Sequence, residues 1–462
     1  MRVLMVASEA TPLAKTGGLG DVVGTLPQAL EKLGATVAVV LPRYRAIPLT
    51  NARLVCSGLR VWMHDGYHLC DVYALPHHSV TYYLLDCPGL YDRDAIYGYA
   101  DDHVRFAVLS LGALGVARHL FRPDVLHCHD WHAALVPLYL KNFFPGDPTF
   151  AGVKTLLTIH NLYDSRLQRG QLWDLGLDDR YFRPDQLELY GAVSVLKAGL
   201  VYADRISTVS PSYAREIQTP EFGHGLDGLL RARGVTGIIN GADYEEWNPE
   251  TDRHLPAHYS ASDLSGKREC KAALLAEFGF PVEKVIDRPL IGIVARLVEQ
   301  KGFELVRETF HEFCALDMTC IVLGSGEYRY ETMFWHMEQF HREKVRAYLG
   351  YSNPLAHRIE AGADLFLMPS RYEPCGLSQI YSLRYGTLPV VRATGGLNDT
   401  VDGETGFKFW GYTGREMIAA LEYALATYQN RERWLTMVTA AMSRDFSWPQ
   451  QAAQYLTLYR EL

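Results

Sequence analysis

The sequence predicts an α/β protein made of two doubly wound domains with parallel sheets, and three observations lead to this prediction. Short β-branched runs alternate with longer helical stretches along the whole chain, which is typical of parallel strands joined by helices. The stretch 240–267 interrupts this rhythm, because it is rich in Asn, Asp, Pro, Ser and His and has little periodicity. The length of 462 residues allows two large domains or about three average ones, so a boundary at this connector gives domains of roughly 240 and 200 residues.

In the first domain, short apolar runs rich in Val, Ile, Leu and Thr predict buried parallel strands. They lie at 3–7, 36–41, 125–127, 155–159, 206–209 and 235–239. The longer stretches between them predict helices at 21–33, 103–119, 131–143 and 187–203. Residues 51–85 differ, because shorter alternating segments that contain Tyr and His predict an antiparallel addition to the first sheet.

The second domain repeats the pattern, with strands expected at 290–295, 319–323, 345–349, 365–368 and 388–391. Ligands of such sheets bind beyond the carboxyl ends of the strands, so we expect functional residues in the loops that follow them. Two facing domains of this kind also predict a central cleft between them.

Composition and charge exclude several classes of protein. With 48% apolar and 21% charged residues, the chain is expected to bury a full core rather than to be disordered. The net charge of −8 argues against a nucleic-acid partner. No uncharged apolar run approaches the ~18 residues of a membrane helix, and the first residues do not resemble a signal peptide, so we expect no membrane association. Eight cysteines without a Cys-x-x-Cys pair predict reduced thiols and a cytoplasmic location.

A glycine-rich loop follows the first expected strand and reads Lys-Thr-Gly-Gly-Leu-Gly-Asp at 15–21. Glycines let the backbone approach a phosphate, the following helix offers free N–H groups, and Lys15 adds a positive charge. A near-repeat, Thr-Gly-Gly-Leu-Asn-Asp-Thr, occupies 394–400 and predicts a matched anion-binding loop in the second domain. The glycine spacing does not fit a dinucleotide fingerprint and no Walker lysine follows, so an NAD enzyme and a P-loop ATPase are disfavoured.

Two loops of the second domain carry charges that suit a sugar diphosphate. Arg296 and Lys301 follow the strand expected at 290–295, where Arg can bind phosphate oxygens in a fork and Lys can neutralise them. Glu373 follows the strand expected at 365–368, and a carboxylate beside the N–H groups of a helix terminus can bind sugar hydroxyls. Cys375 needs no nucleophilic role, because a small polarisable residue can simply pack.

Three histidines and an acid lie where the strand expected at 125–127 meets the next helix, namely His127, His129, Asp130 and His132. No second group of ligands accompanies them, so a zinc site is disfavoured and no metal is expected. We instead expect Asp130 to line the active site, with the histidines as hydrogen-bonding supports. His160 and Asn161 follow the strand expected at 155–159 in the same way. Together these loops predict a site for a nucleotide diphosphate attached to a polyhydroxyl group.

In these motifs the chain resembles the bacterial glycogen synthases and plant starch synthases, glucosyltransferases with the GT-B fold. The matching motifs follow the family's order through nearly the whole chain and lie at 15–21, 129–132, 160–161, 196–199, 210–216, 240–243, 296–301, 373–377, 392–397 and 445–448. The resemblance implies transfer of glucose from ADP-glucose to the non-reducing 4-hydroxyl of an α-1,4-glucan, with retention of configuration and without a metal or other cofactor. It also implies that residues 445–462 cross back from the second domain (240–444) to complete the first (1–239).

The resemblance further implies which residues form the site. It assigns catalysis to Lys15, Asp21, Asp130, His160, Arg296, Lys301 and Glu373. It assigns donor binding to Gly17, Gly18, Asn240, Tyr351, Cys375, Gly376, Leu377 and Tyr381. In this scheme the cations neutralise the diphosphate leaving group, Glu373 binds the glucose hydroxyls, and His160 and Asn240 hold the 6-hydroxyl. Asp21 and Asp130 line the donor and acceptor sides, Tyr351 stacks on adenine, and Tyr381 lies near the ribose.

The chain departs from the family's pattern after Asn161, where the family usually continues to Tyr-Gln-Gly and this sequence reads Leu-Tyr-Asp-Ser-Arg at 162–166. A GT-B transferase with another nucleotide sugar or a small acceptor is therefore the alternative. A silent glucan-binding protein is disfavoured, because Lys15, Arg296, Lys301 and Glu373 are all present. A phosphorylase is a further alternative and would need a lysine-bound pyridoxal cofactor. The sequence leaves the acceptor length, the oligomeric state and the regulation open.

Overall fold

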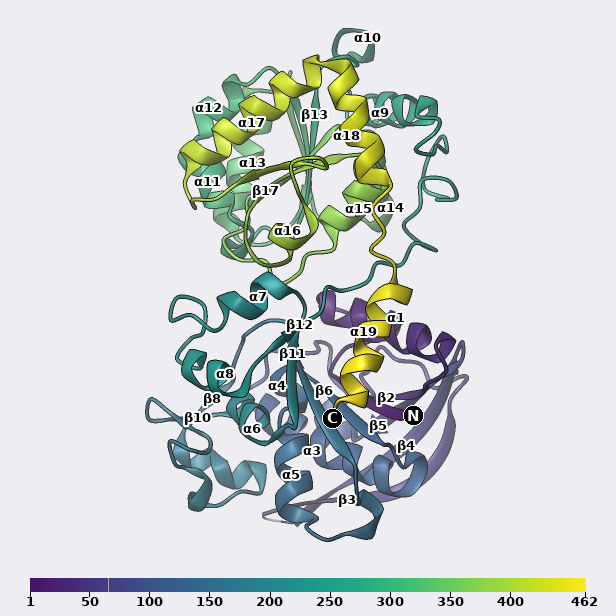
Figure 1. Cartoon of the computed structure of the whole chain (residues 1–462), viewed down its shortest axis with the longest axis vertical. Helices are drawn as coiled ribbons and strands as arrows, with labels where there is room; N and C mark the ends of the chain where they lie inside the picture. Colours follow the sequence, from purple (N-terminus) through teal and green to yellow (C-terminus); the bar gives the residue numbers. More distant parts are fainter. Residues whose placement is uncertain (65) are drawn as a thin grey trace. The chain divides into compact units, whose positions relative to one another are not determined.

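The computed structural model describes residues 1–64 and 66–462. Two compact units make up the chain, Met1–Gly241 with Trp448–Leu462 and Ala242–Ser447 (Figure 1). The sequence predicted boundaries after residues 239 and 444, whereas the units divide after 241 and 447. The difference arises because Ala242 and Ser447 pair as a parallel bridge inside the second unit, where the Ala242 N–H donates to the Phe446 carbonyl at 2.8 Å. The predicted cleft between the domains stays a prediction.

The first unit contains a nine-stranded sheet in the order β12-β11-β7-β6-β1-β2-β5-β4-β3. Its strands are β1 (Arg2–Val6), β2 (Thr36–Pro42), β3 (Arg53–Met63), β4 (Gly66–His77), β5 (Val80–Asp86), β6 (Val125–His129), β7 (Lys154–Ile159), β11 (Arg205–Thr208) and β12 (Thr236–Gly237). Pairing is parallel except along β4, which runs antiparallel to β3 and β5. The predicted antiparallel addition is confirmed, with β5 joining β2 in parallel.

The last helix of the chain completes the core of the first unit. Helices α1 (Gly18–Lys32) and α19 (Trp448–Arg460) pack against each other (Figure 1). Leu26 and Leu30 of α1 and Tyr455 of α19 are buried in one apolar cluster with the sheet. The C-terminal segment therefore contributes apolar surface that the first unit buries on folding.

Helix α3 (Asp102–Val116) and the π-helix Ala117–Phe121 that continues it form one apolar segment in the first unit. By length and composition alone this segment is long and apolar enough to cross a membrane. Of its most apolar window, however, 67% is buried inside the structure, as in the core helix of a globular domain.

The helix predicted at 187–203 is wrong in its first half. Strands β9 (Glu188–Leu189) and β10 (Ala192–Ser194) occupy it and join β8 (Arg166–Leu167) in a small sheet. Between them, Tyr190 and Gly191 have φ values of 53° and 80°, a left-handed turn that a helix cannot contain. Only then does α6 (Val195–Tyr202) begin, with the Ser194 hydroxyl accepting from the Lys197 N–H at 3.1 Å.

The helix predicted at 131–143 is two helices, α4 (Asp130–Ala133) and α5 (Leu135–Phe143). The other α-helices of the first unit in the described part of the chain are short: α2 (Pro88–Tyr91), α7 (Pro211–Glu216) and α8 (Asp227–Arg233).

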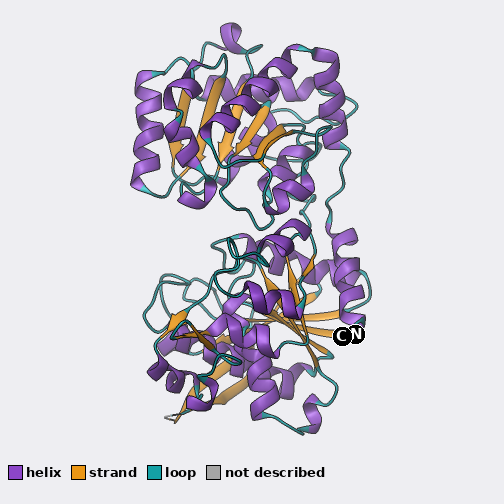
Figure 2. Cartoon of the chain, turned by 60° about the vertical axis from the view of Figure 1, so that its left-hand side comes forward, coloured by secondary structure: helices purple, strands orange, loops and turns teal. Residues whose placement is uncertain are grey.

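The second unit contains a six-stranded parallel sheet in the order β15-β14-β13-β16-β17-β18. Its strands are β13 (Leu290–Val294), β14 (Thr319–Gly324), β15 (Val345–Leu349), β16 (Leu365–Met368), β17 (Leu388–Arg392) and β18 (Phe407–Phe409). The first five confirm the predicted strands to within one residue, whereas the sequence prediction missed the three-residue β18. The helices that lie along this sheet are α9 (Ser265–Glu277), α10 (Val282–Val285), α11 (Phe303–Glu308), α12 (Phe310–Ala315), α13 (Tyr328–Phe340), α14 (Asn353–Gly362), α15 (Ser378–Arg384), α16 (Gly395–Thr400), α17 (Gly414–Gln429) and α18 (Arg431–Met442). Figure 2 shows strands lying between helices in each unit.

Candidate active site

The sheet topology selects one position in each unit for ligand binding. A doubly wound sheet has a switch point where consecutive strands leave in opposite directions, and ligands bind beyond the carboxyl ends of the strands there. In the second unit β13 has β14 on one side and β16 on the other, so the switch point lies between β13 and β16. In the first unit β1 has β2 on one side and β6 on the other, which puts the switch point between β1 and β6. The predicted charged loops follow these four strands.

At the switch point of the second unit, Lys301 and Glu373 form an ion pair. The Lys301 Nζ lies 2.6 Å from the Glu373 Oε2, which also accepts from the Ser370 hydroxyl at 3.1 Å. The Glu373 side chain is 7% exposed and that of Lys301 is 19% exposed. The ion pair holds the Glu373 carboxylate in one orientation in the loop after β16. Both contacts are made by Oε2, and Oε1 takes part in neither of them.

Arg296 follows β13 and is exposed. Among the residues that the structure describes, none accepts a hydrogen bond from its guanidinium or forms an ion pair with it. Its backbone is ordered, because the Arg296 carbonyl accepts from the Val298 N–H at 3.0 Å. A free guanidinium at the carboxyl end of a central strand can bind a phosphate ligand in a fork without breaking an existing contact.

Glycines let the loops of this site approach one another. Gly302 has a φ of 75°, and a Cβ there would lie 1.8 Å from the Pro369 carbonyl oxygen. Gly395, in the second copy of the near-repeat, would bring a Cβ to 1.9 Å from the Glu373 carbonyl oxygen. The Gly396 N–H donates to that oxygen at 3.1 Å. The near-repeat at 394–400 thus supports the Glu373 loop by close packing, a role that its likeness to an anion-binding loop did not predict.

The segment Cys375, Gly376 and Leu377 leads from Glu373 into α15. Gly376 has a φ of 76°, which glycine adopts at little cost. The Gln379 amide donates to the carbonyls of Cys375 and Gly376 at 3.1 Å each, so these carbonyls are turned toward α15. Cys375 is buried, as expected for a packing role.

The two predicted nucleotide-contacting tyrosines have different surroundings. Tyr351 follows β15 and is 81% exposed. Tyr381, on α15, stacks face to face on Trp247 with ring centroids 4.1 Å apart, and Trp247 stacks in turn on His357 at 3.7 Å. His357 Nδ1 lies 2.7 Å from the Asp252 carboxylate. Sequence reasoning missed this stack, because its members come from separate segments without a shared motif.

In the first unit, the glycine loop after β1 already holds an internal acid. Glu9 is 4% exposed, and its Oε2 accepts from the Gly17 N–H at 2.9 Å and from the Thr16 N–H. Lys15 pairs with Asp21 at 2.7 Å, and its side chain remains 48% exposed. A Cβ built at Gly18 meets nothing within 4 Å, so the backbone is open to a ligand there. The prediction missed Glu9, although a polar pair, Ser8-Glu9, abruptly ends an apolar strand.

Asp130 begins α4 with a φ of 57°, in the left-handed region that Asp tolerates better than most residues. Its Oδ1 accepts from the His160 N–H at 2.6 Å and weakly from the Asn161 N–H at 3.4 Å. Burial, with a smaller contribution from the nearby charge of Glu9, raises the pKa of Asp130 to about 7, against the lowering effect of these two N–H groups. Asp130 and His160 therefore form one unit at the ends of β6 and β7.

The histidines of this cluster are buried and neutral. Burial lowers the pKa of His127, His132 and His160 to about 3 each. His129 Nδ1 and His160 Nε2 lie 2.9 Å apart and share a hydrogen bond. The buried polar atoms that have no hydrogen-bond partner among the described residues include three from this cluster and the predicted donor-binding residues, namely His129 Nε2, His132 Nδ1 and Asn240 Oδ1. Such atoms are normally paired, so they are candidates to bind a ligand's hydroxyl groups.

The divergent segment after Asn161 is tied to neighbouring elements. The Leu162 N–H donates to the Tyr213 hydroxyl at 2.9 Å. Asp164 accepts from the Leu196 N–H at 3.0 Å and pairs with Arg166 at 2.7 Å, while Tyr163 is 64% exposed. The loop thus keeps a defined conformation with residues that differ from the family's pattern.

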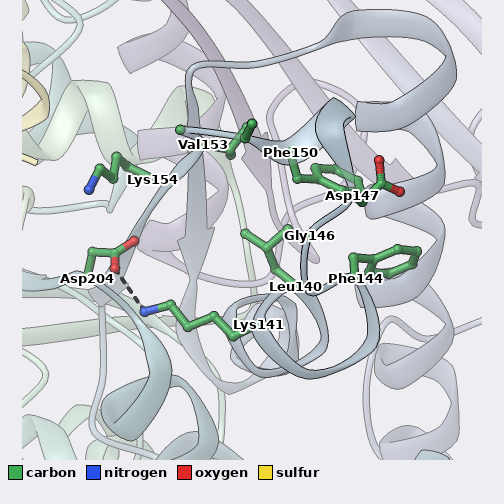
Figure 3. A pocket seen from close by; sticks show the side chains of 11 residues that line it. Leu140, Lys141, Phe144, Gly146, Asp147, Phe150, Val153, Lys154 and Asp204 are labelled. Carbon is green, nitrogen blue, oxygen red and sulfur yellow. Dashed lines mark hydrogen bonds and ion pairs between the residues drawn. The ribbon is translucent and has the colours of Figure 1, made fainter.

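A surface pocket of the first unit lies away from these residues (Figure 3). Lys154 is the first residue of β7, and Asp204, which directly precedes β11, pairs with Lys141 at 2.8 Å. The pocket therefore opens at the amino ends of the strands, whereas the candidate site lies at their carboxyl ends. In the described part of the chain, no three His, Cys, Asp or Glu side chains are grouped so that they could hold a metal ion.

Comparisons with known proteins agree with this geometry. Residues 2–232 match the family model of the starch synthase catalytic domain, and residues 277–436 match that of glycosyl transferases group 1. The chain is 43% identical to a glycogen synthase from Koribacter versatilis, over 100% of this chain and 98% of the relative. It is 46% identical to a glycogen synthase from Anaeromyxobacter sp., over 100% and 99%. The catalytic domain of starch synthase IV from Arabidopsis thaliana, solved with ADP and acarbose, is 34% identical and superposes with a TM-score of 0.91, over 99% of this chain and 98% of that one.

Proposed function

Because the chain belongs to the glycogen and starch synthase family of GT-B glycosyltransferases, we propose that it transfers glucose from ADP-glucose to the non-reducing end of an α-1,4-glucan with retention of configuration. The observation that carries the proposal is the cluster Arg296, Lys301 and Glu373 at the switch point of the second unit. Adenine as the base is supported by the starch synthase IV structure, which contains ADP.

In the proposed reaction the second unit stabilises the leaving group. Departure of ADP from the glucose C1 leaves negative charge on the diphosphate, and Arg296 with Lys301 would neutralise it. The Lys301 ammonium is already fixed by Glu373 at 2.6 Å, so it would not have to move when ADP leaves. Glu373 would accept hydrogen bonds from glucose hydroxyls, with support from the backbone at Cys375, Gly376 and Leu377.

Two tyrosines of the second unit would bind the nucleoside. Tyr351, 81% exposed, is available to stack on adenine. Tyr381 would lie near the ribose, with its ring orientation fixed by Trp247 at 4.1 Å.

The first unit would bind the sugar with neutral groups. Asp130 accepts from the N–H groups of His160 and Asn161. The Asn161 N–H lies in the same peptide plane as the His160 carbonyl, so this contact orients the carbonyl that would stabilise the oxocarbenium character of glucose in the transition state. His160 and Asn240 would hold the 6-hydroxyl, and the unpartnered atoms of Asn240, His129 and His132 support a hydroxyl-binding role. Lys15, Asp21 and the backbone at Gly17 and Gly18 would complete the donor side.

We propose that the reaction needs no metal or other cofactor, since the charge on the leaving group has its counter-ions in Arg296 and Lys301. We also propose a reducing, cytoplasmic location, which the eight free cysteines support.

The test is incorporation of labelled glucose into glycogen from ADP-glucose and from UDP-glucose, with maltose as a short acceptor. We expect incorporation from ADP-glucose into glycogen. No incorporation from either donor contradicts the proposal. Incorporation only from another donor, or only into maltose, supports the alternative of a different nucleotide sugar or a small acceptor, which the divergent loop with its Asp164–Arg166 pair favours.

A further inference from the structure

The acid that binds the glycine loop, Glu9, accepts three hydrogen bonds with its buried carboxylate. One oxygen accepts from the N–H groups of Thr16 and Gly17, the latter at 2.9 Å. The other oxygen accepts from the Tyr97 hydroxyl at 2.6 Å. Glu9 therefore joins the loop after β1 to the segment that precedes α3.

These contacts change what the glycine loop can offer to a ligand. N–H groups at the beginning of a helix attract anions, and here an anion of the chain itself already binds the two N–H groups that directly precede α1. A phosphate can then contact the loop through Lys15 and through the backbone at Gly18. The space beside Gly18 is open, because a Cβ built there meets no other atom within 4 Å. The Glu9 carboxylate thus holds the loop in one conformation through contacts within the chain.

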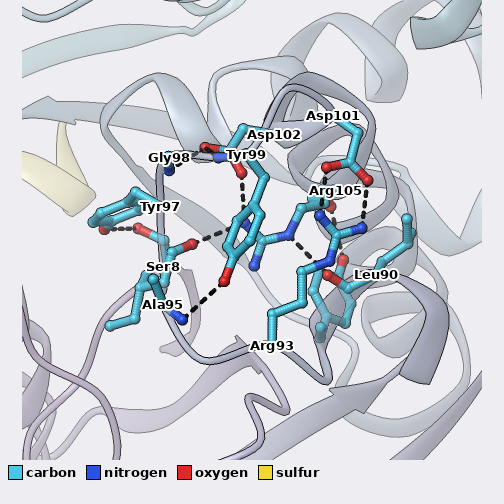
Figure 4. A network of polar contacts seen from close by, with 12 residues as sticks. Ser8, Leu90, Arg93, Ala95, Tyr97, Gly98, Tyr99, Asp101, Asp102 and Arg105 are labelled. Carbon is cyan, nitrogen blue, oxygen red and sulfur yellow. Dashed lines mark hydrogen bonds and ion pairs between the residues drawn. The ribbon is translucent and has the colours of Figure 1, made fainter.

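Tyr97 is itself held firmly. Its hydroxyl also lies 2.7 Å from the Ser8 hydroxyl, and its ring stacks on His132 with centroids 4.8 Å apart. The segment around it is fixed by Arg105, a fully buried residue of α3 whose guanidinium donates to the carbonyls of Leu90 at 2.8 Å and Ile96 at 2.9 Å. Figure 4 shows Arg105 and Tyr97 within one polar network.

From this geometry we propose that Glu9 is a positioning residue, which sets the Lys15–Gly18 loop for the nucleotide sugar and couples it through Tyr97 to His132. The inference rests on the proposed function, since it takes the loop to serve an anionic donor. Glu9 does not itself touch the substrate in this scheme.

The charge of Glu9 has an electrostatic cost that packing alone does not explain. Its negative charge adds to the rise in the pKa of Asp130, so it repels a charge on the Asp130 carboxylate. A neutral side chain of the same shape would avoid this repulsion. It would also weaken the hydrogen bonds to the Thr16 and Gly17 N–H groups, because bonds to an ionised acceptor are about twice as strong as neutral ones.

The experiment compares Glu9→Gln and Glu9→Ala with wild type in two measurements on the full chain. Calorimetric titration gives the Kd of ADP, and hydrogen exchange gives the protection of the Thr16 and Gly17 amides without ligand. We expect the Kd to rise about tenfold in Glu9→Gln and about a hundredfold in Glu9→Ala, with amide exchange accelerating in the same order. The partial rescue by Gln follows because its carbonyl can still accept from the two amides.

The matched control is Glu31→Gln, since the Glu31 carboxylate also accepts a backbone N–H, that of Val37 at 3.2 Å, near the other end of α1. We expect wild-type ADP binding in this variant. An unchanged Kd and unchanged amide exchange in Glu9→Gln and Glu9→Ala overturn the inference, as does an equal loss in Glu31→Gln. If wild type neither binds ADP nor transfers glucose, the proposed function fails instead, and the amide exchange still tests whether Glu9 orders the loop.

Discussion

Replacing Asp130 by Asn should make the protein more stable and less active. The carboxyl is 8% exposed, and burial raises its pKa from 3.8 to about 7. Asn has nearly the same shape, tolerates the left-handed φ of 57°, and keeps an oxygen that can accept from the His160 N–H. The substitution therefore removes the ionisation of residue 130 while leaving its main contact in place.

The sign and size of the effect follow from the two pKa values of Asp130. The pKa of Asp130 is higher in the folded state, so folding favours the protonated carboxyl. The stability that depends on this protonated form is fully present below pH 3.8 and is lost as the pH rises to about 7. Relative to a residue that stays neutral, wild type is less stable by about 2 kcal/mol at pH 5.5 and about 4 kcal/mol at pH 8.5. At about 2–4 °C per kcal/mol, the Tm advantage of Asp130→Asn should widen by about 4–8 °C between these pH values.

The assay is thermal unfolding of both proteins from pH 5.5 to pH 8.5, together with the rate of glucose transfer. Asp204→Asn is the control, because the contacts of Asp204 with Lys141 and Thr155 outweigh burial and lower its pKa. Its loss of stability should be constant over this range, which lies above both pKa values of Asp204. We expect the wild-type rate to rise with pH through about 7 and the Asp130→Asn rate to lack this rise. A Tm difference that does not change with pH would refute the reasoning.

Three further substitutions test the second unit. Arg296→Ala should lower kcat by roughly 10²–10³. Its Tm should not change, because the guanidinium has no partner among the described residues. Arg268→Ala on the same unit should have wild-type kinetics, and a near-normal kcat in Arg296→Ala would remove Arg296 from the site. Lys301→Ala should destabilise the folded protein by about 3 kcal/mol, because it leaves the buried Glu373 carboxylate without its cation. In denaturant unfolding, the double variant with Glu373→Gln should recover part of this loss, and full additivity of the two losses would contradict the pairing. Gly302→Ala should lower the Tm by several degrees, because the φ of this residue is 75° and a Cβ would lie 1.8 Å from the Pro369 carbonyl oxygen. An unchanged Tm would show that the loop relaxes freely.

Sequence reasoning predicted the sheets well because buried parallel strands are continuous apolar runs, as at β13 to β17. It failed at 187–203 because two short strands and a helix together gave an apolar pattern of helical length, and the turn at Tyr190 and Gly191 was not recognised. The three-residue strand β18 is too short for a period-two pattern to be recognised. These errors lie where local geometry, rather than periodicity, decides the structure.

At the candidate site, sequence reasoning found the charged residues that belong to motifs and missed the ones that act on them. Glu9 is a single acid outside any motif, and only the folded loop reveals its contacts with Gly17 and Tyr97. The stack of Tyr381, Trp247 and His357 likewise joins segments that are far apart in the sequence. Positioning contacts of this kind depend on tertiary packing, and one sequence does not show which distant side chains meet.

The two clusters differ in charge in a way that suits the two halves of the proposed substrate. In the first unit burial lowers the pKa of His132 and His160 to about 3, so these side chains are neutral at physiological pH. Neutral hydrogen-bonding groups can bind a sugar without repelling an anion or competing for it. In the second unit Arg296 is exposed and charged, and Lys301 is fixed beside Glu373. A diphosphate would have its counter-ions there, and in the proposed scheme a chain with a net charge of −8 needs only a few cations, set at one strand edge, to bind an anionic donor.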